Sequence, residues 1–108
     1  MNIKLGTTGQ YLAPGGEENL VIIRGVFDFN GSIIVGSGFT VSHTGNGVYS
    51  VTFNTAFSGP PAVAATGDQG SVISIRGDTA SSVSFQSQTI SNGELGDGTI
   101  HFIAIGPR

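Results

Sequence analysis

Hydroxyl, imidazole and carboxylate side chains are the groups in this 108-residue sequence that could carry out chemistry, and cysteine is absent. Serine, histidine and aspartate are the residue types of a nucleophilic triad, and the two histidines are His43 and His101. No Gly-x-Ser-x-Gly turn is present to position a serine as the nucleophile. The lack of cysteine excludes a thiolate nucleophile and a disulfide. The sequence therefore predicts a protein that is not an enzyme.

Acidic residues occur in the expected loops, as Asp68, Asp78, Glu94 and Asp97. Such carboxylates could bind Ca²⁺ together with backbone carbonyls, or flank the cleft of a glycosidase. Their spacing matches neither an EF-hand nor a calcium-binding nonapeptide. The glycine-rich stretch at residues 93–98 precedes an expected strand, whereas a phosphate-binding loop follows a strand and opens a helix. We predict no metal site and no cofactor.

The charge of the chain excludes two further classes of partner. Seven acidic and four basic residues give a net charge of −3, and the basic residues are spread along the chain. Binding to a phosphate backbone requires clustered Lys and Arg, so no nucleic acid partner is expected. No stretch approaches the ~18 apolar residues of a membrane-spanning helix, so no membrane insertion is expected. Charged residues make up 10% of the chain, which indicates a polar and largely uncharged surface.

The elements that must position these side chains are expected to be β-strands. The sequence contains 11 Ile, 9 Val and 10 Thr, and β-branched residues favour pleated strands over helices. Segments of alternating apolar and polar residues are separated by turn-forming residues. The expected strands are residues 20–29, 33–35, 39–43, 48–53, 62–66, 71–77, 82–89 and 99–105. We predict an all-β fold, an antiparallel β-sandwich of about seven or eight short strands.

Two local features give more detailed expectations. Asn46-Gly47 lies between two alternating segments, which predicts a type I′ hairpin turn with both residues at positive φ. In the expected strand 20–29, Phe29 is predicted to lie on the same face as Val21, Ile23 and Phe27, and Gly25 is expected to form a bulge or bend.

The chain is expected to have one folded domain preceded by a connector. Residues 1–19 have no sustained hydrophobic period and are rich in turn-forming residues, so we interpret them as an N-terminal arm. Residues 20–108 are predicted to form the β-sandwich domain.

The expected strands 20–29 and 99–105 are apolar on both faces, although a strand in a sandwich normally has one solvated face. We predict that the extra apolar face is buried between subunits of a symmetric oligomer. The alternative is that the N-terminal arm covers this face within one chain. The residues predicted to lie at the subunit interface are Leu20, Ile22, Arg24, Arg76, His101, Ile103 and Ile105.

The apolar pattern from residue 47 to residue 106 resembles that of the H-type lectin-like domain. This resemblance rests on Gly47-Val48-Tyr49-Ser50-Val51-Thr52-Phe53, Phe57, Pro61, Val63, Ile73, Ile75, Val83, Phe85 and Phe102-Ile103-Ala104. Members of this family occur in invertebrate agglutinins and in trimeric tips of bacteriophage tail fibres. The resemblance implies a homotrimer on a virion or another extracellular surface, with cell-surface glycans as its ligands.

Glycan binding would use the polar loops, because their amide and carboxylate groups suit sugar hydroxyls. The predicted ligand-binding residues, from loops 67–70, 78–81 and 91–98, are Asp68, Gln69, Asp78, Asn92, Glu94 and Asp97. A second resemblance, carried by residues 47–53, is to the C1q/TNF-like jelly roll. It implies a trimerisation module with no ligand of its own.

Overall fold

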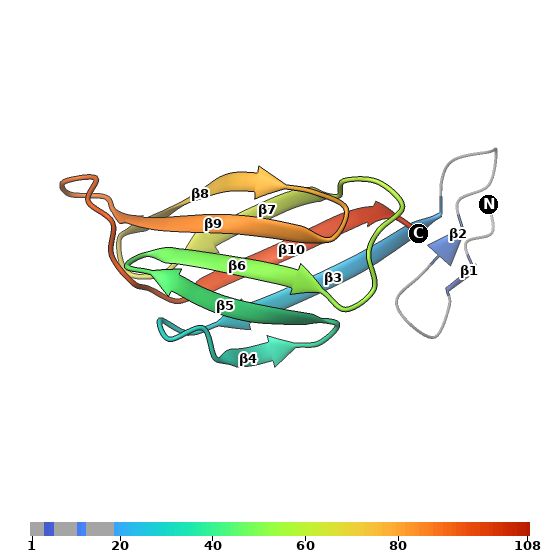
Figure 1. Cartoon of the computed structure of the whole chain (residues 1–108), viewed down its shortest axis with the longest axis horizontal. Helices are drawn as coiled ribbons and strands as arrows, with labels where there is room; N and C mark the ends of the chain where they lie inside the picture. The colour runs from blue at the N-terminus through green and yellow to red at the C-terminus, as the bar shows by residue number, and fades with distance from the viewer. Residues whose placement is uncertain (1–3, 6–10, 13–18) are drawn as a thin grey trace.

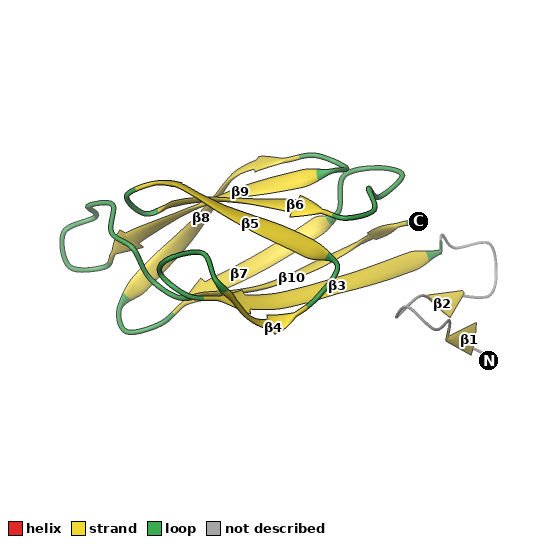
Figure 2. Ribbon diagram, turned by 60° about the horizontal axis from the view of Figure 1, so that its bottom comes forward, coloured by secondary structure: helices red, strands yellow, loops and turns green. Residues whose placement is uncertain are grey.

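The computed structural model describes residues 4–5, 11–12 and 19–108. These residues form two antiparallel sheets, which face each other in Figures 1 and 2. The strands are β1 (Lys4–Leu5), β2 (Tyr11–Leu12), β3 (Leu20–Phe27), β4 (Ile33–Gly36), β5 (Phe39–Gly45), β6 (Val48–Phe53), β7 (Ala62–Gly67), β8 (Ser71–Asp78), β9 (Ser82–Thr89) and β10 (Ile100–Pro107). The first sheet has the order β1-β2-β3-β10-β7, with β4 also paired to β3, and the second has the order β5-β6-β9-β8.

The prediction of an all-β fold is confirmed, since the described residues form strands, turns and loops without a helix. From β3 to β10 the structure has eight strands, in the segments where alternation of apolar and polar residues predicts them. Strands β6 and β9 have the predicted bounds, and the other predicted strands differ from the observed ones by one or two residues at their ends. The fold is compatible with the predicted β-sandwich.

The interior between the two sheets is filled mainly by aromatic side chains. The Phe27 side chain lies at the centre, with its ring centroid 5.3 Å from Tyr49, 6.3 Å from Phe85 and 6.2 Å from Phe102. All four side chains are buried. Because successive residues of a strand point to opposite faces, each of these strands can contribute to the core and to a surface at the same time.

The Gly25 backbone lies directly beneath this aromatic core. A Cβ atom at Gly25 would overlap the ring of Phe39 and would lie 2.9 Å from Cε1 of Phe102. Gly25 itself pairs regularly with Phe102 and Gly36, and the register of β3 with β4 shifts between Val26 and Phe27 instead, so the predicted bulge is not at Gly25. Close packing of the aromatic rings accounts for a glycine at this position.

Strand β3 ends two residues earlier than the sequence predicts. The Asp28 carboxylate accepts hydrogen bonds from the backbone N–H groups of Asn30 and Ser32, both at 2.9 Å, and so forms a turn. This turn directs Phe29 outward, where 54% of its surface is exposed. The prediction that Phe29 shares a face with Val21 and Phe27 is therefore wrong, because those two side chains are buried and the turn at Asp28 ends the alternation before Phe29.

The predicted hairpin at Asn46-Gly47 is present, and it joins β5 to β6. The predicted turn type is wrong, because Gly47 has a φ of 72° whereas Asn46 does not have a positive φ. The register shifts by one residue between His43 and Gly45. A type I′ turn matches the right-handed twist of the two strands that it joins. In this hairpin the bulge supplies the additional local twist instead.

The proposed N-terminal arm lies largely outside the described residues, namely at positions 1–3, 6–10 and 13–18. Its described parts are β1 and β2, which pair with each other, while Tyr11 pairs with Leu20 at the start of β3.

Ser87 provides a test of how polar groups are accommodated in this core. Its side chain is 1% exposed, and its hydroxyl has no hydrogen-bond partner in the described part of the chain. A buried hydroxyl without a partner costs about 1–3 kcal/mol in desolvation. We expect Ser87→Ala to raise the free energy of unfolding by about 1 kcal/mol, as measured by urea denaturation. The control is Ser84→Ala on the same strand, and a lower stability of Ser87→Ala would contradict this account.

Candidate functional site

Four turns lie at one end of the sandwich, on the left in Figure 1. They are residues 28–32, 45–47, 68–70 and 90–99, and we call them together the loop end. Backbone hydrogen bonds connect the last three of these turns with one another and with β9. The N–H of Ile90 donates to the carbonyl of Gly70 at 2.8 Å, and the N–H of Ser87 donates to the carbonyl of Gly47 at 2.7 Å.

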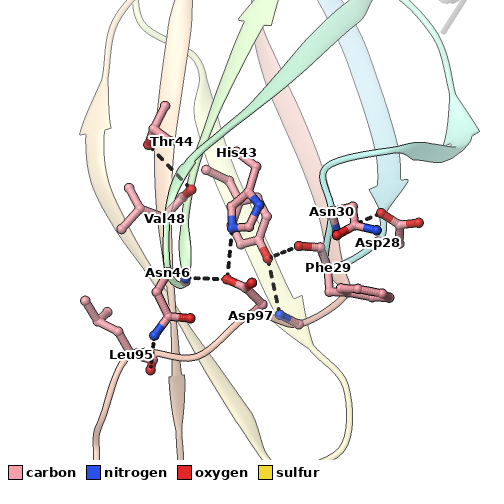
Figure 3. A network of polar contacts seen from close by, with 12 residues as sticks. Asp28, Phe29, Asn30, His43, Thr44, Asn46, Val48, Leu95 and Asp97 are labelled. Atoms are coloured by element: carbon pink, nitrogen blue, oxygen red, sulfur yellow. Dashed lines mark hydrogen bonds and ion pairs between the residues drawn. The ribbon is translucent and has the colours of Figure 1, made fainter.

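Asp97 is the centre of a polar network at the loop end, shown in Figure 3. Its Oδ1 accepts a hydrogen bond of 2.6 Å from the N–H of Gly47 and lies 2.9 Å from Nε2 of His43. Next to it, the side chain of Asn46 donates to the carbonyl of Leu95 at 3.0 Å. The hairpin between β5 and β6 is thereby attached to the loop between β9 and β10.

Tyr49 extends the same network into the core. Its hydroxyl donates to the carbonyl of Phe29 at 2.8 Å and accepts from the N–H of Gly98 at 3.3 Å. The imidazole of His43 stacks on the Tyr49 ring, with centroids 4.6 Å apart and planes inclined by 12°. Three segments that are distant in the sequence therefore meet around two side chains.

The arrangement holds the loops together. In the described residues, no serine or threonine hydroxyl is bonded to His43. The phenol of Tyr49 is fully buried and both of its hydrogen bonds are to backbone groups. Sequence reasoning did not find this network, because His43 and Asp97 are 54 residues apart and no local pattern links them.

Asp97 gives the first pH-dependent prediction. The hydrogen bond from Gly47, and then the interaction with His43, hold the pKa of the Asp97 carboxyl below its ordinary value. A depressed carboxyl pKa stabilises the fold above the unfolded-state pKa of about 4, and this stabilisation is lost as the pH falls through the folded-state pKa. We expect Asp97→Asn to lower the Tm at pH 7 and to flatten the fall in Tm between pH 5 and 2. Thermal melts check this.

The matched control for that experiment is Asp68→Asn. It removes an exposed carboxylate at the same end of the molecule but outside the network. Equal effects of the two substitutions on Tm would mean that Asp97 does not hold the loops.

Tyr49 gives a second pH-dependent prediction, which concerns stability at alkaline pH. Burial raises the pKa of its phenol above the ordinary value of 10.0. Its contribution to stability is therefore complete below pH 10 and is lost as the pH rises through the folded-state pKa. We expect Tyr49→Phe to be less stable at pH 7 by about 1 kcal/mol, the typical net value of one hydrogen bond. The variant should also lose less stability than the unmodified protein between pH 9 and 11.5, and an equal loss in both would contradict the assignment.

The loop end contains five of the six predicted ligand-binding residues. Asp68 and Gln69 lie in the turn between β7 and β8, and Asn92, Glu94 and Asp97 lie in the loop between β9 and β10. Asn92 Oδ1 is engaged within its own loop, by the hydroxyl of Thr89 and the N–H of Glu94.

Asp78 is not part of this group. It pairs with Val83 at the hairpin between β8 and β9, which lies at the opposite end of the sandwich (Figure 1). Of the loops predicted to bind ligand, 67–70 and 91–98 therefore lie at one end and 78–81 lies at the other. Loops that alternate along an antiparallel sheet necessarily fall at alternate ends, and the sequence analysis did not apply this rule to them.

Six of the seven predicted interface residues lie together on the outer face of the first sheet. Cross-strand pairing places Ile22 opposite Ile105 and Arg24 opposite Ile103. Leu20 and His101 continue this face along β3 and β10. On the other side of β10, strand β7 contributes Ala62 and Ala64, which pair with Ile105 and Ile103. We call this surface the apolar face, and it comprises Leu20, Ile22, Arg24, Val26, Ala62, Ala64, Thr66, His101, Ile103 and Ile105.

The apolar face has a shallow depression of about 360 Å³ lined in part by Arg24, Ala64, His101 and Ile103. Ile103 is 39% exposed within one chain. Arg76, the seventh predicted interface residue, lies on β8 of the second sheet and is separate from the other six.

The described residues contain no group of three or more histidine, cysteine and acidic side chains arranged to hold a metal ion. Nor do they include a helix with the length and apolar character needed to cross a membrane. Comparison with family models, curated proteins and solved structures gave no match to this chain.

Proposed function

We propose that this chain is a non-enzymatic module that forms a homotrimer through the apolar face and serves as a binding or structural tip of a virion or other extracellular surface. Cell-surface glycans are the proposed ligands. The observation that carries the proposal is the apolar face, on which Ile22, Ile103 and Ile105 lie side by side next to two alanines.

The argument for association rests on burial of this face. Full burial of an exposed aliphatic side chain stabilises an assembly by roughly 1.5–3 kcal/mol. Ile103 is exposed, and Leu20, Ile22 and Ile105 are half-buried within one chain, so their burial together would contribute several kcal/mol. Arg24, which lies among them, would be paired with an acidic residue of a neighbouring subunit, and its planar guanidinium suits such a pair.

The threefold symmetry is supported by the resemblance to H-type lectin-like domains, whose subunits associate as trimers. Ligand binding is supported by the chemistry of the loop end. Asp68, Gln69 and Glu94 are exposed there, and carboxylate and amide groups are suitable partners for sugar hydroxyls. The network around Asp97 would hold this end rigid, which lowers the entropic cost of binding.

Light scattering coupled to size exclusion, together with a glycan array, tests the proposal. A mass three times that of the 11.0 kDa chain and binding to a defined set of glycans are the expected results. A trimer without any bound glycan would support the purely structural role instead. A chain that stays monomeric at micromolar concentration would overturn the proposal.

A further inference from the structure

The outer face of the second sheet differs in chemistry from the apolar face. Strands β5, β6 and β9 turn their core residues inward, including Val41, Val51 and Val83, and expose the alternate positions. These alternate positions carry mainly hydroxyl and amide groups. Figure 2 shows β5, β6, β9 and β8 as one continuous layer above the first sheet.

The hydroxyl groups on this face are in register across three strands. Ser42 pairs with Ser50, which pairs with Ser84. One step along the strands, Thr40 pairs with Thr52, which pairs with Ser82. Strands are about 4.8 Å apart, and alternate residues along a strand are about 6.7 Å apart. We call these six residues the hydroxyl grid.

The hydroxyl grid is accessible and its polar groups are largely unused. Thr40, Ser42 and Thr52 are exposed, and the three other members are half-buried. Of the six side chains, only that of Ser82 has a hydrogen-bond partner among the described residues, the hydroxyl of Thr79. The remaining hydroxyls can donate to, and accept from, an external partner.

The absence of charge is the second observation, and it indicates what kind of partner this is. The sequence from Phe29 to Gly67 contains no Asp, Glu, Lys or Arg, and neither does β9. The charged residues of this sheet, Arg76 and Asp78, lie on the adjoining edge strand β8, outside the hydroxyl grid. A soluble sheet face usually carries charges of both signs, at about 25–35% of surface positions. Charged side chains are expensive to desolvate, whereas hydroxyls exchange water for another hydroxyl at little net cost. A charge-free array of donors and acceptors is therefore complementary to a neutral, hydroxyl-rich surface.

We propose that the hydroxyl grid is a docking surface for a neutral polysaccharide chain, which lies across β5, β6 and β9. This inference rests on the proposed function and assigns glycan binding to a sheet face in addition to the loop end. In the proposed trimer the apolar face is turned toward the other subunits. The hydroxyl grid, on the opposite side of the sandwich, then faces outward.

A pelleting assay with insoluble cellulose, chitin and β-1,3-glucan tests this proposal. The variant removes one row of hydroxyls, Ser42→Ala/Ser50→Ala/Ser84→Ala. The matched control removes three exposed hydroxyls outside both the hydroxyl grid and the loop end, Ser37→Ala/Thr55→Ala/Ser58→Ala. We expect at least one polymer to retain the unmodified protein and the control, and at least a tenfold weaker association for the row variant. Retention should be insensitive to salt up to about 0.5 M, because the hydroxyl grid itself carries no charge.

Three outcomes would overturn the proposal, and each can be separated from failure of the proposed function. No retention on any of the polymers, equal retention of the row variant, or release by salt would each exclude the hydroxyl grid as the site. A separate outcome concerns the loop end. If the row variant still forms the trimer and still binds glycans on the array, while Asp68→Ala/Glu94→Ala loses glycan binding, the loop end alone binds glycans. Circular dichroism and melting of the row variant confirm that it remains folded.

Discussion

Phe27→Ala is expected to lower the free energy of unfolding by about 3–5 kcal/mol, which is a large share of the stability of a domain of this size. The Phe27 side chain is 0% exposed and is surrounded by three other aromatic rings, those of Tyr49, Phe85 and Phe102. Removing it leaves a cavity between the two sheets that neighbouring rings can fill only in part.

Chemical denaturation of the variant measures this effect, and Phe29→Ala is its matched control. The two phenylalanines are two residues apart, but Phe29 is 54% exposed. We expect the control to change stability by less than about 1 kcal/mol. Similar losses in the two variants would contradict the placement of Phe27 at the centre of the core.

Ile103→Lys is expected to convert the proposed trimer into folded monomers. The new ammonium group would lie beside Arg24, its cross-strand neighbour on the apolar face. Burying this second positive charge in the interface is strongly unfavourable, because the new ammonium group loses its hydration, gains no acidic partner and is repelled by Arg24. We expect the dissociation constant of the assembly to rise by at least a hundredfold, as measured by analytical ultracentrifugation over a range of concentrations.

The control for this prediction is Ile90→Lys, which adds the same charge at a residue that is 72% exposed in the loop end. It should leave the oligomeric state unchanged. If Ile103→Lys has the same oligomeric state as the unmodified protein, the apolar face is not the subunit interface.

Much of the secondary structure could be predicted because its causes are local. Alternation of apolar and polar residues with a period of two reports which side of a strand is buried, and this needs no knowledge of partner strands. Strand β9 has the predicted bounds for this reason, and the buried rings of Tyr49 and Phe85 are those that the alternation turned inward. The exception at Phe29 arose from another local cause, the turn formed by the Asp28 carboxylate.

The predicted interface residues on β3 and β10 show how far such reasoning extends. The sequence identified two strands that are apolar on both faces, and the structure pairs these two strands directly. Their outward residues therefore form one surface. Arg76 does not belong to it, because the outward face of β8 belongs to the other sheet.

By itself, the sequence determined the all-β class, most strand positions and the residues that face inward, since each depends on a few neighbouring residues. Only the tertiary structure decided which loops meet and which faces are continuous. The pairing of His43 with Asp97, the separation of Asp78 from the other loop acids and the alignment of hydroxyls across β5, β6 and β9 all depend on strand order and register. Strand order and register result from packing of the whole aromatic core, which no local segment of the sequence contains.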